Sequence, residues 1–134
     1  MFAAWTVPAL LSTFETVMFA RLMGRQIEVW RAFLTQAPGW YTWAAFTPLI
    51  VALASRWPLA RPFRWRALGA HLAGYLVVAL AASAVWAVVG SWLRGPAGGP
   101  FLTTMRNWFV SGLPFTVLVY AAVVGIYYLS LIHI

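Results

Sequence analysis

Four long apolar stretches constrain the fold of this chain more than any other feature of its sequence. They run over residues 2–23, 39–57, 67–92 and 108–128. A helix needs about 20 apolar residues to cross roughly 30 Å of hydrocarbon at about 1.5 Å per residue. The chain is 63% hydrophobic and 8% charged, whereas a soluble domain carries roughly 25% charged residues. We therefore predict an all-α integral membrane bundle of four transmembrane helices over these ranges.

Three short connections join the predicted helices. Residues 25–38 contain alternating apolar side chains and could form a helix in the membrane interface. Residues 55–66 hold four arginines together with Pro58 and Pro62, and they predict a tight basic turn. Residues 93–107 include the sequence GPAGGP, which favours a flexible loop.

The arginines indicate the orientation of the predicted bundle. Four of them crowd the 55–66 turn: Arg56, Arg61, Arg64 and Arg66. Because cytoplasmic loops are enriched in Lys and Arg, we expect this turn and both termini on the cytoplasmic side of a bacterial inner membrane. The opposite side would hold five arginines, but they are less dense and Glu28 offsets part of their charge. We expect the four arginines to contact anionic lipid headgroups, with contact to a cytoplasmic domain as the alternative.

Two ionisable side chains within the apolar stretches are candidate sensing residues. Glu15 lies inside the first predicted helix, where an ionisable group costs at least about 2.5 kcal/mol and usually faces the bundle interior. It could sense protons or cations, or it could simply be bonded to Ser12 on the same helix face. His71 could titrate or ligate a metal, with a structural hydrogen-bonding or headgroup role as the alternative. The two side chains should not pair, because they lie about 13 Å apart in depth.

The Thr47-Pro48 pair places a proline inside the second predicted helix. Proline frees the carbonyl of Ala44, and the Thr47 hydroxyl can bond back to the Trp43 carbonyl. The resulting bend could act as a hinge or could be packing geometry alone. Aromatic residues near this pair could also line an outward-facing ligand pocket: Trp30, Trp40 and Trp43.

The sequence offers no catalytic constellation. Its only acidic side chains are Glu15 and Glu28, and it contains no cysteine and only two histidines. A set of nucleophile, histidine and acid cannot be assembled, and no phosphate-binding loop follows a strand. We therefore expect no catalytic residue, no metal site and no cofactor in this chain, and no binding of nucleic acid by its scattered arginines.

An ordered set of motifs lies between Trp40 and Leu72. It comprises an aromatic cluster, a Thr-Pro pair, an arginine followed by a proline, and a histidine opening the next helix: Trp40, Tyr41, Trp43, Thr47, Pro48, Arg56, Pro58 and His71. In these motifs the chain resembles the membrane-spanning front of LytS/YehU-type sensor histidine kinases. The resemblance implies a sensor and anchor domain over residues 1–128, in a homodimer, without the cytoplasmic part that phosphorylates its own histidine and then a response regulator.

Two other functions remain open at this point. Some membrane-bound LytTR transcription regulators look like they carry a similar front. A small multi-pass transporter, or a fragment of one, is the third possibility, although few polar groups meet at one depth. The last six residues, LSLIHI, resemble a translated transposon end used in DNA library preparation. We therefore expect residues 129–134 to be an artefactual tail and the natural reading frame to continue beyond Tyr128, with a short natural tail as the alternative.

Overall fold

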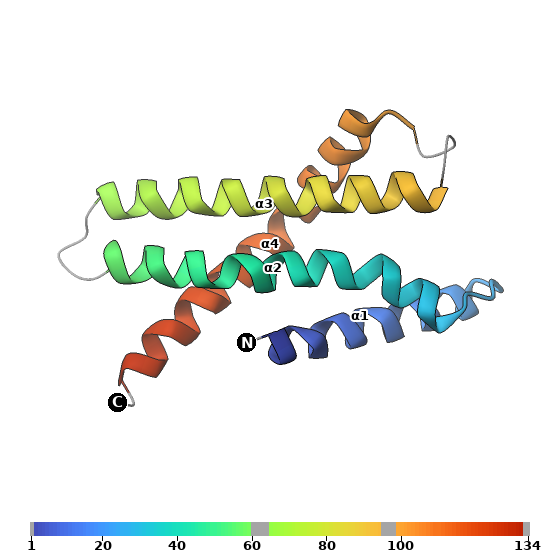
Figure 1. Cartoon of the computed structure of the whole chain (residues 1–134), viewed down its shortest axis with the longest axis horizontal. Helices are drawn as coiled ribbons and strands as arrows, with labels where there is room; N and C mark the ends of the chain where they lie inside the picture. Colours follow the sequence, from blue (N-terminus) through green and yellow to red (C-terminus); the bar gives the residue numbers. More distant parts are fainter. Residues whose placement is uncertain (1, 60–64, 95–98, 133–134) are drawn as a thin grey trace.

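The computed structural model describes residues 2–59, 65–94 and 99–132, which form four α-helices and no strand. In chain order they are α1 (Phe2–Leu22), α2 (Val29–Arg56), α3 (Trp65–Arg94) and α4 (Phe101–Ile132) (Figure 1). The predicted all-α class is therefore confirmed.

The helix α2 is the centre of the arrangement, because it packs against each of the other three helices. Figure 1 shows α2 and α3 side by side and antiparallel, α1 along the first part of α2, and α4 crossing α2 and α3 obliquely. The core lies where α2, α3 and α4 meet. It is formed by three residues from each of these helices: Trp43, Ile50, Ala54, Tyr75, Val78, Ala79, Tyr120, Val123 and Val124.

The start of α2 differs from the prediction. The helix begins at Val29 rather than at Gly39, so most of the predicted connection 25–38 belongs to it and Pro38 lies inside it. A proline removes one backbone hydrogen bond, which neighbouring helices can compensate in a membrane bundle. Gln36 and Trp40 flank Pro38 and both donate hydrogen bonds to side chains of α1. These contacts hold the segment on both sides of Pro38 along α1.

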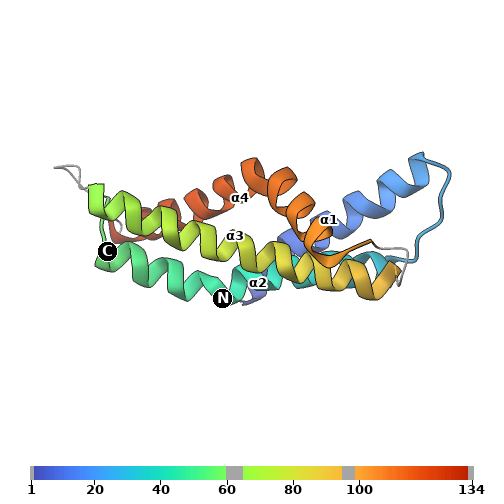
Figure 2. The same cartoon turned by 90° about the horizontal axis from the view of Figure 1, so that it is seen from above.

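The fourth helix is longer than predicted at both ends. It begins at Phe101, where the carbonyl of Pro100 accepts a hydrogen bond from the Thr104 amide, so the predicted loop 93–107 is helical in its second half. It continues to Ile132, so the first four residues of the suspected tail extend the helix. Figure 2 shows a bend within α4, and Pro114 is the proline inside this helix.

Three of the four helices in the described part of the chain are long and apolar enough to cross a membrane. They correspond to Ala3–Leu22, Trp65–Leu93 and Phe101–Ile132. The prediction of four spans is thus supported clearly for three. Helix α2 contains three threonines, three tryptophans and one tyrosine, which lower its mean hydropathy. Large apolar side chains cover the outside of the helices, as Phe14 (65% exposed) and Leu118 (68% exposed) illustrate. An apolar exterior of this extent, together with three candidate spans, indicates a membrane protein.

Candidate functional site

The structure separates the candidate residues into two sites at opposite ends of α2. Thr16 beside Glu15 is bonded to Gln36, near the start of α2, whereas His71 is bonded to the carbonyl of Trp57, just after its end. These two levels lie about 30 Å apart along the helix at about 1.5 Å per residue. Glu15 and His71 therefore do not pair, as predicted, but they lie farther apart than the predicted separation of about 13 Å in depth.

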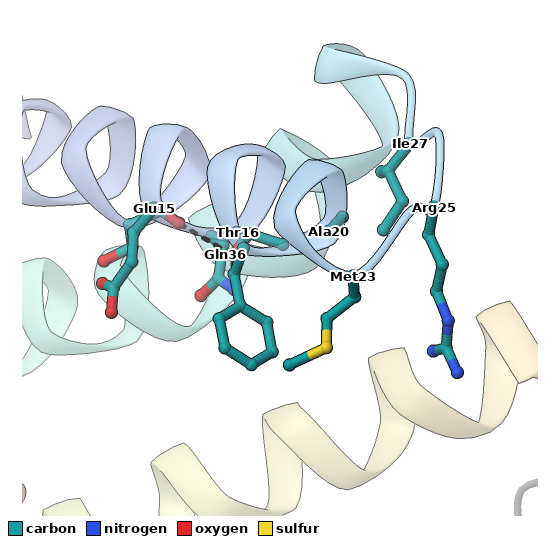
Figure 3. Close-up of a pocket in the computed structure, with 9 residues that line it drawn as sticks. Glu15, Thr16, Ala20, Met23, Arg25, Ile27 and Gln36 are labelled. Atoms are coloured by element: carbon teal, nitrogen blue, oxygen red, sulfur yellow. Dashed lines mark hydrogen bonds between the residues drawn. The ribbon is translucent and has the colours of Figure 1, made fainter.

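Glu15 borders a cavity of about 390 Å³ where α1 ends and α2 begins (Figure 3). The lining combines polar groups with apolar side chains: Ser12, Glu15, Thr16, Phe19, Ala20, Met23, Arg25, Ile27 and Gln36. Glu15 is exposed to this space rather than enclosed in the core. The cavity therefore presents one carboxylate and one guanidinium beside hydroxyl and amide groups.

Hydrogen bonds between α1 and α2 build the polar wall of the cavity. The Gln36 amide nitrogen donates to the Thr16 hydroxyl over 2.8 Å, and that hydroxyl donates to the Ser12 carbonyl over 2.8 Å. The Ser12 hydroxyl accepts a bond from the Trp40 indole nitrogen over 2.9 Å. The Ser12 hydroxyl, which the sequence offered as a partner for Glu15, therefore accepts a bond from a side chain of the neighbouring helix, and a bond from Ser12 to Glu15 stays a prediction.

The turn after α1 places Arg25 at the same cavity. Gly24 has φ of 71°, and the Arg25 amide donates to the Ala20 carbonyl over 2.8 Å. This is the Schellman arrangement, in which a glycine in the left-handed region ends the helix and turns the chain back. The guanidinium of Arg25 is thereby brought to the cavity from the end of the helix that carries Glu15.

A second cavity, of about 420 Å³, adjoins the first and shares Thr16, Ile27 and Gln36 with it. Its aromatic wall is formed by Trp86 of α3 and Trp108 of α4, which stack with ring centroids 5.0 Å apart. The aromatic residues that border this second cavity are not among the three tryptophans predicted from the sequence to line a pocket.

The three predicted tryptophans lie elsewhere. Trp30 is exposed and donates to the Glu28 carboxylate, and Trp43 is buried in the core. Trp40 lines an apolar groove between α1 and α4. Spacing along one helix indicated an aromatic cluster, but it could not show that tryptophans from α3 and α4 stack at the cavity.

His71 forms the second site, at the other end of α2. Its side chain is only 5% exposed. One ring nitrogen, Nε2, lies 3.1 Å from the Trp57 carbonyl, and the other, Nδ1, lies 3.1 Å from the Tyr120 hydroxyl. A carbonyl only accepts, so Nε2 carries the proton in neutral imidazole and the Tyr120 hydroxyl donates to Nδ1. This geometry matches the structural hydrogen-bonding alternative, whereas a sensing role for His71 stays a prediction.

Tyrosine hydroxyls extend this site along α4. Tyr75 of α3 bonds to the Thr116 hydroxyl over 3.0 Å, and its ring meets Tyr120 edge-on. Near the end of α4, the Tyr128 hydroxyl accepts a bond from the Leu59 amide over 3.0 Å and donates to the Ala54 carbonyl over 3.3 Å. We call His71, Tyr75, Tyr120 and Tyr128 the tyrosine-histidine cluster. It ties the second half of α4 to α3 and to the end of α2.

The Thr47-Pro48 pair lies between the two sites. As predicted, the Thr47 hydroxyl donates to the Trp43 carbonyl over 2.8 Å, and it also accepts a bond from the Trp5 indole over 3.1 Å. Pro48 is inside α2 with its side chain exposed. The pair therefore joins α1 to α2, and its role as a hinge stays a prediction.

The structure describes two of the four arginines that are predicted to contact lipid headgroups. Arg56 ends α2 and Arg66 lies in the first turn of α3, both with exposed side chains. Arg61 and Arg64 lie outside the described residues. Among residues 2–59, 65–94 and 99–132, no group of three or more His, Cys, Asp or Glu side chains could hold a metal ion.

No family model, curated protein or solved structure matches this chain. The cavity beside Glu15 and the tyrosine-histidine cluster are therefore the observations on which a functional proposal depends.

Proposed function

We propose that this chain is the membrane-embedded signal-input and anchoring region of a bacterial two-component sensor histidine kinase of the LytS/YehU type. The observation that carries the proposal is the separation of two polar sites along one bundle. An open cavity with a carboxylate lies at one end, and a buried hydrogen-bonded cluster that involves α4 lies at the other. Two separate sites in one bundle support signal reception, because a ligand at one end can then alter helix packing at the other.

In this proposal α2 crosses the membrane as the fourth and central helix of the bundle. Its contacts with α1, α3 and α4 shield much of its surface from lipid. Its polar side chains find partners inside the bundle, as the bonds from Gln36 to Thr16 and from Trp40 to Ser12 show. Polar groups that are satisfied by neighbouring helices are tolerated in a spanning helix of low hydropathy.

The positions of the arginines support a membrane between the two sites. Arg31 and Arg56 lie about 37 Å apart along α2, which exceeds the roughly 30 Å hydrocarbon layer. Arg21 and Arg25 lie at the same end as Arg31, near the cavity, and Arg66 lies at the end of Arg56. With the basic turn and both termini in the cytoplasm, the Glu15 cavity faces outward, and Arg56 and Arg66 contact anionic headgroups.

Signal transmission would proceed through α4. A stimulus that occupies the cavity changes the packing of α1 on α2, and α2 contacts α4 directly. Tyr120 and Tyr128 hold α4 against the end of the bundle opposite the cavity, so two packings of that cluster would place the end of α4 differently. In a homodimer such a shift would reach the cytoplasmic kinase part, which then phosphorylates a LytTR-type response regulator.

Long-read sequencing of the locus beyond the codon for Tyr128 tests the proposal. A phospho-accepting histidine block followed by ATP-binding motifs would support it. A DNA-binding domain in the same frame would replace it with a membrane-bound LytTR regulator, and a genomic stop codon after Ile134 would refute both. In that last case, solute uptake into proteoliposomes would test the transporter alternative.

A further inference from the structure

We infer that the Glu15 cavity binds a small linear zwitterion, with its ammonium group at Glu15 and its acidic group at Arg25 (Figure 3). The inference deepens the proposed function, since such a ligand would be the stimulus of the sensor. It depends on four features of the cavity: its two charges, their spacing, its polar wall and its apolar side chains.

Two opposite charges border the same cavity without bonding to each other. Figure 3 shows Glu15 and Arg25 at its two ends, with Thr16, Gln36 and Met23 between them. In the described part of the chain, the ion pair that forms is instead Arg31 with Glu28, at 3.4 Å. A carboxylate near a bilayer and a guanidinium at its edge each favour a counter-charge. One molecule that carries both charges supplies both partners at once.

The separation of the two charged residues sets a lower limit to the length of the ligand, because Figure 3 shows the Arg25 side chain at the far end of the cavity, pointing away from Glu15. The backbone of Arg25 is anchored to the Ala20 carbonyl, and Glu15 precedes Ala20 by about 7.5 Å along the helix axis at about 1.5 Å per residue. A free amino acid, in which one carbon separates the charged groups, is too short for this span. An extended peptide covers about 3.3–3.6 Å per residue, so at least two to three residues are needed to cover this backbone separation.

The wall of the cavity supplies acceptors for an ammonium group beside Glu15. The side-chain nitrogen of Gln36 donates to the Thr16 hydroxyl, and the side-chain oxygen of Gln36 can accept a hydrogen bond from a ligand. An ammonium group offers three donors, and a carboxylate with an amide oxygen nearby can accept them. A metal ion fits less well, since the described residues provide no group of three ligating side chains.

Apolar side chains occupy the middle of the cavity. Phe19, Met23 and Ile27 belong to its lining, and Figure 3 shows Met23 between Glu15 and Arg25. They would contact the backbone methylenes or small side chains of a short peptide, whereas the adjoining cavity with Trp86 and Trp108 offers space for a larger apolar side chain. Such a lining favours a ligand with charged ends and an uncharged body.

Isothermal titration of the full chain in lipid nanodiscs with glycine, diglycine and triglycine tests the inference. We expect diglycine or triglycine to bind at least about tenfold more tightly than glycine, which is too short to reach both charged residues. N-acetyl-diglycine and diglycine amide each lose one charge, so both should bind at least about tenfold more weakly than diglycine. These blocked ligands test the charge requirement on the unaltered protein.

Variants of Glu15 and Arg25 test whether these two residues bind the charged ends of the ligand. Glu15→Gln and Arg25→Gln should each weaken diglycine or triglycine binding at least about tenfold. The matched controls, Glu28→Gln and Arg21→Gln, remove the same charges from residues that do not line this cavity, and they should leave binding unchanged. Circular dichroism checks that each variant stays helical.

Several results would overturn the inference: no oligoglycine binds, blocked and unblocked ligands bind equally, or the two cavity variants bind like their controls. Because the assay measures binding to this chain alone, it fails or succeeds independently of the kinase proposal. If the locus encodes a kinase but no oligoglycine binds, the zwitterion inference is wrong and the sensor-kinase proposal stands. If oligoglycine binds but the locus encodes no kinase, the zwitterion inference stands and the sensor-kinase proposal is wrong.

Discussion

The contact between α2 and α3 at Gly39 provides the most direct test of the packing. A Cβ atom at this position would overlap the indole of Trp86, which in turn stacks on Trp108 with centroids 5.0 Å apart. Gly39→Ala must therefore displace a side chain that also forms the wall of the second cavity. Gly69, on α3, is the matched control because a Cβ there would meet nothing within 4 Å.

The expected change in the free energy of unfolding follows from two destabilising effects and one stabilising effect. Overpacking a well-filled contact costs about 1–3 kcal/mol, and a lost aromatic stack adds about 0.5–1.5 kcal/mol. Replacing glycine by alanine within a helix returns about 1 kcal/mol. We therefore expect Gly39→Ala to lower the free energy of unfolding by about 0.5–3.5 kcal/mol, whereas Gly69→Ala should raise it by about 0.5–1 kcal/mol.

Reversible unfolding in mixed micelles with increasing SDS, followed by helical circular dichroism, measures both changes. The double variant Gly39→Ala/Trp86→Leu should recover part of the lost stability, because the smaller side chain leaves room for the new methyl group. If the two alanine variants were equally stabilised, Gly39 would not contact Trp86 and the described packing of α2 on α3 would be wrong.

Two further predictions concern the tyrosine-histidine cluster and the membrane. His71→Leu and Tyr120→Phe should each destabilise the chain by about 1–3 kcal/mol in the same unfolding assay, with a coupling of about 0.5–1.5 kcal/mol between them; additive effects would show that the two side chains do not share a bond. Because the chain has no cysteine, Gln26→Cys and Ser55→Cys can be labelled selectively with a membrane-impermeant maleimide. We expect labelling of Gln26→Cys from outside intact cells and of Ser55→Cys only in inverted vesicles, and labelling of both from one side would show that α2 does not cross the membrane.

Local interactions were the part of this protein that could be predicted well. The bond from Thr47 to the Trp43 carbonyl spans one helical turn, and it follows from residue type and spacing alone. The bounds of α2 were less predictable, because Pro38 reads as an interruption until the contacts of Gln36 and Trp40 with α1 are known. The partner of Ser12 was not predicted for the same reason, because the indole nitrogen that donates to its hydroxyl belongs to Trp40 of another helix.

The sequence by itself determined that the chain is helical and apolar, because helix length and hydrophobicity are properties of consecutive residues. Only the tertiary structure decided which polar side chains share a site. Arg25 reaches the Glu15 cavity through a turn at Gly24, and His71 meets Tyr120 across 49 positions in the chain. Such contacts depend on how whole helices are placed and rotated against each other, and no short stretch of sequence encodes that placement.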